Sequence, residues 1–254
     1  MGEPMRPFWR YYGGKWQVAP HYPAPAVWPI VEPFAGAAGY STRHGAGREV
    51  ILVDANPIIA GIWRWLIQAT PDDVRAIGDI PEGGTVDDID APQEARWLAG
   101  FWCNDAAVAP CKRASKFALA NVERGVVGGW NARARDRIAA QVPLIKRWTV
   151  VEGDYRAAPD IRATWFVDPP YQNKAGSYYP CQPDSFEALG AWCRSRRGLT
   201  IVCENEGATW LPFEPLAGRR AAPTSRTGKK TVEAVWLGGE LRQPTLWDAE
   251  VAVG

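Results

Sequence analysis

The sequence has few of the residues on which metal centres and disulfide frameworks depend. Only two of its 254 residues are histidines, His21 and His44, and its five cysteines are widely spaced without a C-x-x-C pair. The presence of only two imidazoles argues against a histidine-based metal centre and against a serine–histidine triad. The cysteine spacing argues against both a zinc site and a disulfide framework. We therefore expect chemistry that uses carboxylates, backbone groups and a cofactor, with no metal.

Long hydrophobic segments are also missing. No stretch approaches the roughly 18 uninterrupted apolar residues of a membrane span, and the start of the chain, Met1 to Arg6, lacks the apolar run of a signal peptide. Arg6 breaks the pattern of a myristoylation signal. Hydrophobic residues make up 46% and charged residues 22% of the chain, which is typical of a soluble globular protein. A cytoplasmic location without membrane association is expected.

The net charge is only +1, but it is unevenly distributed. Residues 71–96 hold eight acids and two bases, residues 100–148 hold nine bases and three acids, and residues 194–230 hold eight bases and three acids. Basic blocks in a nearly neutral chain favour contacts with nucleic-acid phosphates. Solvated helix faces produce similar counts, so charge alone leaves both interpretations open.

Short apolar runs, each ending in a polar or glycine-bearing turn, predict buried parallel strands. They lie at 28–31, 50–53, 149–151, 164–167 and 199–203. Helical patterns lie between several of them, for example at 58–67 and after Asp184, which together with Glu187 predicts a capping box. The alternation predicts an α/β fold with a Rossmann-like, doubly wound sheet and helices on both faces.

The segment 70–147 interrupts this alternation. It begins acidic and rich in proline and glycine, and then shows helical patterns at 93–101, 113–123 and 132–145. An insertion of this length between sheet elements predicts a subdomain rather than a loop. We expect residues 1–69 and 148–254 to form one domain, with a mainly helical subdomain inserted at 70–147.

The strongest local signal is the segment Asp168-Pro169-Pro170-Tyr171, which directly follows a predicted buried strand. Open α/β sheets carry their sites at the carboxyl ends of strands. The two prolines remove amide donors and leave carbonyl acceptors beside a carboxylate and an aromatic ring. These groups suit a planar exocyclic amine, whose nitrogen becomes more nucleophilic when acceptors draw it towards tetrahedral geometry. The alternative is a proline turn that only ends the strand.

This segment resembles the catalytic motif of the Dam-like DNA adenine (N6) methyltransferase family, and the order of the other motifs is similar over nearly the whole chain. The resemblance implies a site-specific enzyme that transfers a methyl group from S-adenosylmethionine to N6 of an adenine flipped out of double-stranded DNA. It implies that the inserted subdomain recognises DNA. It also implies that Tyr171 stacks on the extruded base while Asp168 and the Pro169 carbonyl, with Pro170 completing the motif, hold its amino group.

The segment 31–40 resembles the cofactor loop of the same family. A predicted strand ends at Glu32, and the small residues after it let the backbone approach a ligand at a helix N-terminus. Ala38 stands where the family usually has a second glycine. The resemblance implies that five residues bind the cofactor: Glu32, Phe34, Ala35, Gly36 and the catalytic Asp168.

Three further segments complete the predicted cofactor site. Asp54 ends a strand about 20 residues after the glycine-bearing turn, a position that suits ribose hydroxyls, although an acid there can also cap a helix. The resemblance implies that Asp154 accepts from the adenine amino group of the cofactor and that Tyr155 packs beside it. It also implies that Tyr12 and Lys15, in a Tyr-Tyr-Gly-Gly-Lys segment, lie close to the cofactor and the target base.

The basic part of the insertion and a polar loop near the C-terminus are the predicted DNA surfaces. The residues expected to meet phosphates there are Arg113, Lys116, Arg133, Arg135, Arg226, Lys229 and Lys230. Amino-cytosine methyltransferases usually have serine at the position of Asp168, and ribosomal RNA adenine and protein glutamine methyltransferases usually have asparagine. An enzyme acting on cytosine or RNA adenine, or a catalytically silent DNA-binding protein, stays an alternative. The target sequence and the oligomeric state cannot be deduced from the sequence.

Overall fold

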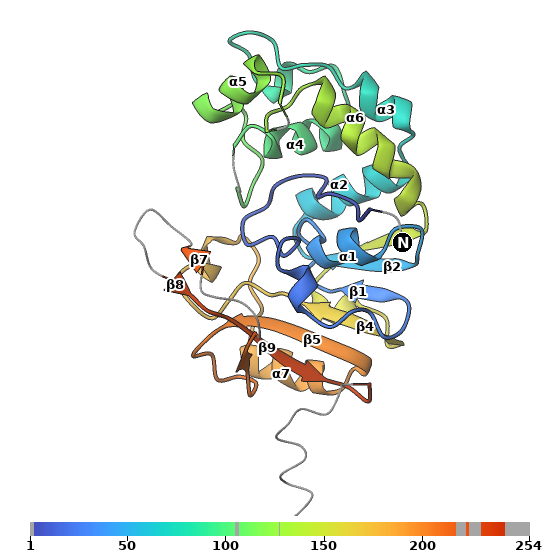
Figure 1. Ribbon diagram of the computed structural model, residues 1–254, viewed down its shortest axis with the longest axis vertical. Coiled ribbons are helices and arrows are strands. Elements are labelled where there is room, and N and C mark those ends of the chain that lie inside the picture. The colour runs from blue at the N-terminus through green and yellow to red at the C-terminus, as the bar shows by residue number, and fades with distance from the viewer. Residues whose placement is uncertain (1–2, 105–106, 127, 217–221, 224–229, 242–254) are drawn as a thin grey trace, which may run out of the picture.

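A seven-stranded sheet forms the centre of the protein (Figure 1). The computed structural model describes residues 3–104, 107–126, 128–216, 222–223 and 230–241. The strands stand in the order β3-β2-β1-β4-β5-β9-β6, and all neighbours from β3 to β5 pair in parallel, whereas β9 runs antiparallel to β5 and β6. Their bounds are β1 Ile30–Glu32, β2 Val50–Asp54, β3 Trp148–Glu152, β4 Arg162–Val167, β5 Arg197–Asn205, β6 Glu214–Pro215 and β9 Glu233–Gly238. This mostly parallel α/β sheet is compatible with a Rossmann-like fold.

Helices cover both faces of the sheet. Side chains of successive strand residues point to opposite faces, and they enter two different hydrophobic clusters: Ile30 and Phe166 belong to one, Val31 and Trp165 to the other. The first cluster includes side chains of α1 (Gly39–His44) and α2 (Pro57–Gln68), and the second includes those of α7 (Phe186–Arg194). Burial on both faces explains why the strands are continuous apolar runs.

The chain between α2 and β3 forms a group of helices at one end of the molecule (Figure 1). These are α3 (Pro71–Ala76), α4 (Gln93–Phe101), α5 (Lys116–Glu123) and α6 (Ala132–Gln141), which is followed by a short 3-10 helix, Val142–Ile145. Trp9 packs between the two parts, with its ring 4.9 Å from that of Trp63 in α2 and 5.8 Å from that of Phe101 in α4. One hydrophobic cluster therefore extends from the sheet into the helical group.

The predicted strands coincide with β1 to β5 to within about two residues, and the prediction of 93–101 as a helix is confirmed by α4. The expected start of α7 is wrong by one residue. Ser185, not Asp184, is the N-cap, and its hydroxyl oxygen accepts a hydrogen bond from the Ala188 amide at 3.2 Å. The carboxylate of Asp184 is used elsewhere, because it accepts a hydrogen bond from the Arg156 guanidinium at 2.8 Å.

A second, two-stranded element consists of β7 (Ala222–Pro223) and β8 (Lys230–Thr231), which pair antiparallel. It lies at the same side of the molecule as the loops that follow the parallel strands (Figure 1).

Gly198 allows the start of β5 to approach the start of β4 closely. Its φ is +105°, and a Cβ atom there would lie 2.1 Å from the Ala163 carbonyl oxygen. Gly207 provides a matched control, because its φ is +96° and a Cβ atom would have no neighbour within 4 Å. We expect Gly207→Ala to lower the free energy of unfolding by about 1–2 kcal/mol, the cost of backbone strain. Gly198→Ala should cost at least about 2 kcal/mol more, because it adds a backbone clash.

Urea unfolding followed by tryptophan fluorescence measures both values. Equal costs for the two substitutions would contradict the close approach of the two strands.

Candidate functional site

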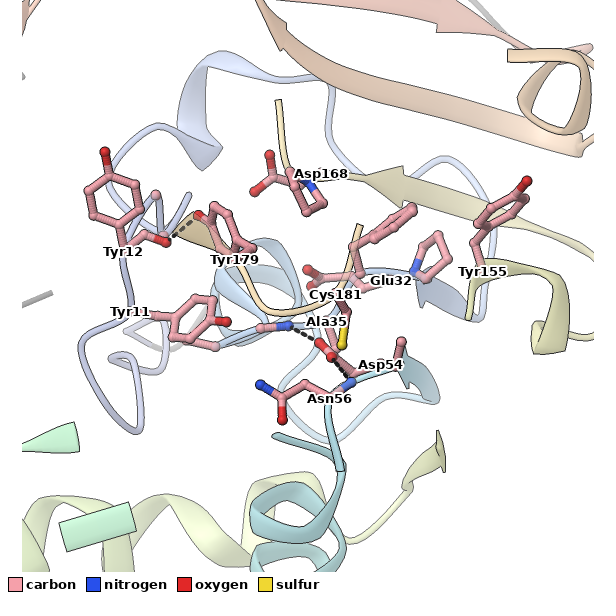
Figure 2. Close-up of a pocket in the computed structure, with 18 of the residues that line it drawn as sticks. Tyr11, Tyr12, Glu32, Ala35, Asp54, Asn56, Tyr155, Asp168, Tyr179 and Cys181 are labelled. Carbon is pink, nitrogen blue, oxygen red and sulfur yellow. Dashed lines mark hydrogen bonds between the residues drawn. The ribbon is translucent and has the colours of Figure 1, made fainter. Parts of the chain in front are cut away.

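A cavity opens at the carboxyl ends of β1, β2 and β4 (Figure 2). It contains about 810 Å³ of space free of protein atoms, counting its opening to solvent. Every residue that the sequence assigned to the cofactor lines it. These residues are Tyr12, Lys15, Glu32, Phe34, Ala35, Gly36, Asp54, Asp154, Tyr155 and Asp168. Segments far apart in the sequence therefore meet at one edge of the sheet.

The loop between β1 and α1 lines the cavity. Gly36 has a φ of +45°, its amide donates a hydrogen bond to Asp54 Oδ2 at 2.8 Å, and its carbonyl accepts one from Trp63 Nε1 at 2.8 Å. A Cβ atom on Gly36 would lie 3.1 Å from the Tyr11 ring. Ala38, where the resembled family usually has glycine, also adopts a left-handed conformation with a φ of 47°. Glycine takes that conformation without strain, so the backbone here has the shape that a glycine would favour.

Asp54 holds this loop against the start of α2. Its Oδ2 atom binds the Gly36 amide, and its Oδ1 atom accepts a hydrogen bond from the Asn56 amide at 2.9 Å (Figure 2). Burial raises the pKa of Asp54 to about 6, while these two amides lower it. Asn56 caps α2 by accepting from the Ile58 amide at 3.0 Å. Because a carboxylate has about four acceptor positions, Asp54 can still accept from hydroxyl groups of a ligand.

Glu32 joins the end of β1 to the first turn of α1. It is buried, with 2% of its surface exposed, and its Oε1 atom accepts a hydrogen bond from the Ser41 amide at 2.6 Å. Burial raises the pKa of Glu32 to about 8, although the Ser41 hydrogen bonds oppose this. The Glu32 side chain is therefore largely uncharged at neutral pH.

An aromatic pair forms one wall. The rings of Phe34 and Tyr155 stack with centroids 5.9 Å apart and an angle of 25° between their planes. Asp154 beside them is paired with Arg156, at 2.5 Å between Oδ2 and Nη2, and Arg156 hydrogen bonds lower the pKa of Asp154. The structure thus gives Asp154 a strong partner that the sequence did not predict, and any ligand would share its carboxylate with Arg156.

Asp168 lies beyond the end of β4 and pairs with Lys15 from the N-terminal segment. The distance from Lys15 Nζ to Asp168 Oδ1 is 2.9 Å, and Lys15 also donates to the Gly13 carbonyl at 3.0 Å. Burial lowers the pKa of Lys15, but the charges of Asp168 and Glu233 more than offset this and raise it overall. Burial raises the pKa of Asp168 to about 6, and Lys15 opposes that rise.

Pro170 lines the cavity, whereas Pro169 and Tyr171 do not. The Tyr171 hydroxyl donates a hydrogen bond to Glu233 Oε1 at 2.5 Å, and Lys15 Nζ lies 4.7 Å from the centre of its ring. One face of the ring is therefore in contact with a cation. The sequence analysis did not assign a role to Glu233, because the strand that carries it comes next to Asp168 only through the sheet.

The chain that follows Tyr171 returns over the cavity and closes one side of it. The Tyr179 hydroxyl donates to the Tyr12 carbonyl at 2.8 Å, and the Tyr179 ring lies 5.9 Å from that of Tyr11 and 6.0 Å from that of Tyr12 (Figure 2). Cys181 lines the cavity from the same loop. Tyr11, Tyr179 and Cys181 were not predicted, because nothing in the local sequence after Tyr171 specifies where this loop packs.

The residues predicted to meet DNA have different surroundings. Arg113 donates to the Gly83 carbonyl at 2.7 Å, and Arg135 pairs with Asp79 at 2.5 Å, so both stabilise the helical group. Within the described part of the chain, Lys116 and Arg133 are exposed and make no ion pair. Arg226 and Lys229 lie outside the described residues, as does the side chain of Lys230, whose backbone is part of β8.

Among the described residues, no group of three histidine, cysteine, aspartate or glutamate side chains is arranged to hold a metal ion. None of the described helices has both the length and the apolar character needed to cross a membrane. No protein-family model matches the chain, and no curated protein sequence matches it.

The raised pKa of Glu32 predicts how stability changes with pH. Because its pKa rises from an ordinary 4.5 to about 8 on folding, protonation favours the folded state, and that stabilisation is lost as pH rises from about 4.5 to about 8. Glu32→Gln keeps an oxygen that can accept from Ser41 but cannot ionise. We expect the free energy of unfolding of the variant, relative to the wild type, to increase across this range by at least about 1.4 kcal/mol, the equivalent of one pKa unit.

Denaturant titrations at pH 5, 6, 7 and 8 are the measurement. Glu49→Gln, an exposed side chain paired with Arg147, is the control. A difference between Glu32→Gln and wild type that does not vary with pH would contradict the assignment.

Proposed function

We propose that the protein is an S-adenosylmethionine-dependent methyltransferase that modifies N6 of adenine in double-stranded DNA. The observation that carries this proposal is the position of Asp168 and Pro170 in the wall of a cavity that also contains Glu32, Gly36 and Asp54. An amine-binding motif and a small-molecule loop from separate strands thus share one cavity. The proposal places the protein in the cytoplasm, where it has access to DNA.

The cavity suits the charge of the cofactor. Besides the largely neutral Glu32, three acids and one lysine line it, an arrangement that favours a cationic ligand with hydroxyl groups over an anion. When bound, S-adenosylmethionine supplies an electrophilic methyl group on a positively charged sulfur. The residues that would hold it are the loop from Phe34 to Gly36, Asp54 for hydroxyl groups, and the aromatic wall of Phe34 and Tyr155.

The residues around Asp168 suit an exocyclic amine. Proline has no amide hydrogen, so Pro169 and Pro170 leave only acceptors next to the carboxylate. Lys15 contacts Oδ1 of Asp168, and the carboxylate has further acceptor positions for amine hydrogens. These acceptors would orient the amine nitrogen and stabilise the positive charge that grows on it. Asp168 would accept a hydrogen bond from an amine proton, which becomes acidic only as the new N–C bond forms and the bond between the methyl group and the sulfur breaks; the proton then passes to the carboxylate.

An adenine in a DNA duplex reaches such a site only when it leaves the base stack, at a cost of a few kcal/mol. Tyr12 and Tyr179 line the cavity, which Tyr171 does not, and they offer aromatic surfaces for an extruded base. Stacking of a base on an aromatic side chain contributes about 1–3 kcal/mol, enough to offset much of that cost.

Removal of the Asp168 carboxylate should stop catalysis without preventing the cofactor from binding. We expect Asp168→Ala to lower methyl transfer by at least about 100-fold, because a group that stabilises developing charge is lost. Cofactor affinity, measured by calorimetry, should stay close to that of the wild type. Asp160→Asn, an exposed acid ahead of the same strand, is the control.

The assay uses labelled S-adenosylmethionine and unmethylated DNA, followed by nucleoside analysis. Detection of labelled N6-methyl-2′-deoxyadenosine supports the proposal. A methylated cytosine, transfer only to RNA, or near-normal activity of Asp168→Ala would each refute it.

Lys116 and Arg133, two exposed cations of the helical group that have no ion pair among the described residues, predict a salt-dependent DNA contact. Lys116→Ala and Arg133→Ala should each weaken DNA binding and reduce the slope of log affinity against log salt concentration by about 1, because each removes one phosphate contact. Fluorescence anisotropy with a labelled duplex measures both quantities. Arg147→Ala, whose guanidinium pairs with Glu49, is the control and should leave the slope unchanged. Equal slopes for all four proteins would exclude the helical group from the DNA interface.

A further inference from the structure

A second buried acid, Glu233, lies next to the proposed catalytic residues but belongs to a different part of the chain. It is the first residue of β9 and pairs with Asn205, the last residue of β5. Because β4 and β5 are parallel neighbours, this register brings Glu233 to the edge of the sheet where Asp168 follows β4. Only 12% of the Glu233 side chain is exposed.

Three groups converge on one oxygen of Glu233. Its Oε1 atom accepts hydrogen bonds from the Tyr171 hydroxyl at 2.5 Å and from the Tyr22 hydroxyl at 2.8 Å, and it lies 3.6 Å from Lys15 Nζ. Two of these partners are the motif tyrosine and the lysine that contacts Asp168.

Lys15 is consequently shared between two carboxylates. Its Nζ atom lies 2.9 Å from Asp168 and 3.6 Å from Glu233, and it stands over the Tyr171 ring. If Glu233 were neutral, Asp168 would be the only described carboxylate within 4.0 Å of the ammonium group. A full ion pair would make Asp168 a weaker acceptor for a substrate amine.

The other titratable groups around this cluster do not replace the contact that Glu233 makes with Lys15. Glu204, a buried acid on β5 that the Lys15 charge also reaches, is held by the Gln172 and Asn205 amides. Burial raises the pKa values of the Cys203 thiol and of the Tyr22, Tyr171 and Tyr179 hydroxyls, so these groups are neutral at physiological pH. Glu32, with a pKa raised to about 8, is largely neutral as well. Among the described residues, the charges that act most directly on Asp168 are therefore those of Lys15 and Glu233.

We propose that Glu233 is a positioning residue. It fixes the Tyr171 hydroxyl and shares the Lys15 ammonium group with Asp168. Because Lys15 is shared, Asp168 stays available as an acceptor for the substrate amine. Its kinetic consequence rests on the proposed methyl transfer. The charge coupling between Glu233 and Asp168 does not, because it follows from the geometry alone.

Glu233→Gln preserves shape and one acceptor oxygen but removes the charge. We expect its kcat to fall about tenfold, the typical effect of weakening one charged hydrogen bond, with little change in KM for the cofactor. The negative charge of Glu233 raises the pKa of Asp168, so its loss should lower that pKa. Because the reaction needs ionised Asp168, the acid limb of the kcat profile should move to lower pH.

Glu214→Gln is the matched control, because Glu214 is an exposed acid on β6, which pairs with β9. It should leave both kcat and the acid limb unchanged. Glu233→Asp is a second variant that keeps the charge and shortens the side chain. Its acid limb should stay closer to that of the wild type than the limb of Glu233→Gln, while its kcat falls because the two hydroxyl contacts are stretched.

Carbon-13 NMR of aspartate labelled at the carboxyl carbon gives a readout that needs no activity, with the Asp168 signal assigned by its loss in Asp168→Ala. A lower Asp168 titration midpoint in Glu233→Gln supports the coupling even if wild-type protein methylates nothing, an outcome that would refute only the proposed function. An unchanged midpoint in Glu233→Gln overturns the inference. If Glu233→Gln does not fold, wild-type kcat in Glu233→Asp overturns it.

Discussion

The buried contact between Lys15 and Asp168 links the parts of the chain on which the site depends. Burying two charges costs several kcal/mol per ion, and close, well-oriented partners must offset that cost. Here the partners come from the N-terminal segment, from the loop after β4 and, through Glu233, from β9. The contact of Lys15 with Glu233 depends on the register of β4, β5 and β9. The network therefore joins the folding of the sheet edge to the geometry of the proposed catalytic residues.

The same edge of the sheet concentrates acids that would repel one another if all were ionised. Burial raises the pKa values of Glu32, Asp54 and Asp168, and each carboxyl is held by backbone amides or by Lys15. A cavity of this kind has acceptor groups ready before any ligand arrives. That arrangement suits a positively charged ligand. It also lowers the free energy of unfolding increasingly as pH rises, because the buried carboxyl groups ionise less readily in the folded state.

Much of the fold was predictable because its signals are local. Buried parallel strands have continuous apolar runs, and a helix such as α4 shows its own periodicity, so both were found from short windows of sequence. The start of α7 was misplaced by one residue because two adjacent side chains, Asp184 and Ser185, can both cap a helix. The choice depended on Arg156, which lies 28 residues away in the sequence and pairs with Asp184.

The sequence by itself determined the five parallel strands, the acids Glu32 and Asp54 at the ends of β1 and β2, and the Asp168-Pro-Pro-Tyr171 turn after β4. These features depend on neighbouring residues and on the rule that parallel strands end at one edge. The tertiary structure decided which of these side chains face the cavity. It turned Tyr171 towards Glu233 and Lys15, paired Asp154 with Arg156, and brought Tyr179 over the cavity. Such contacts join residues far apart in the chain, and their geometry follows from packing and from the need to satisfy buried charges, which no local pattern records.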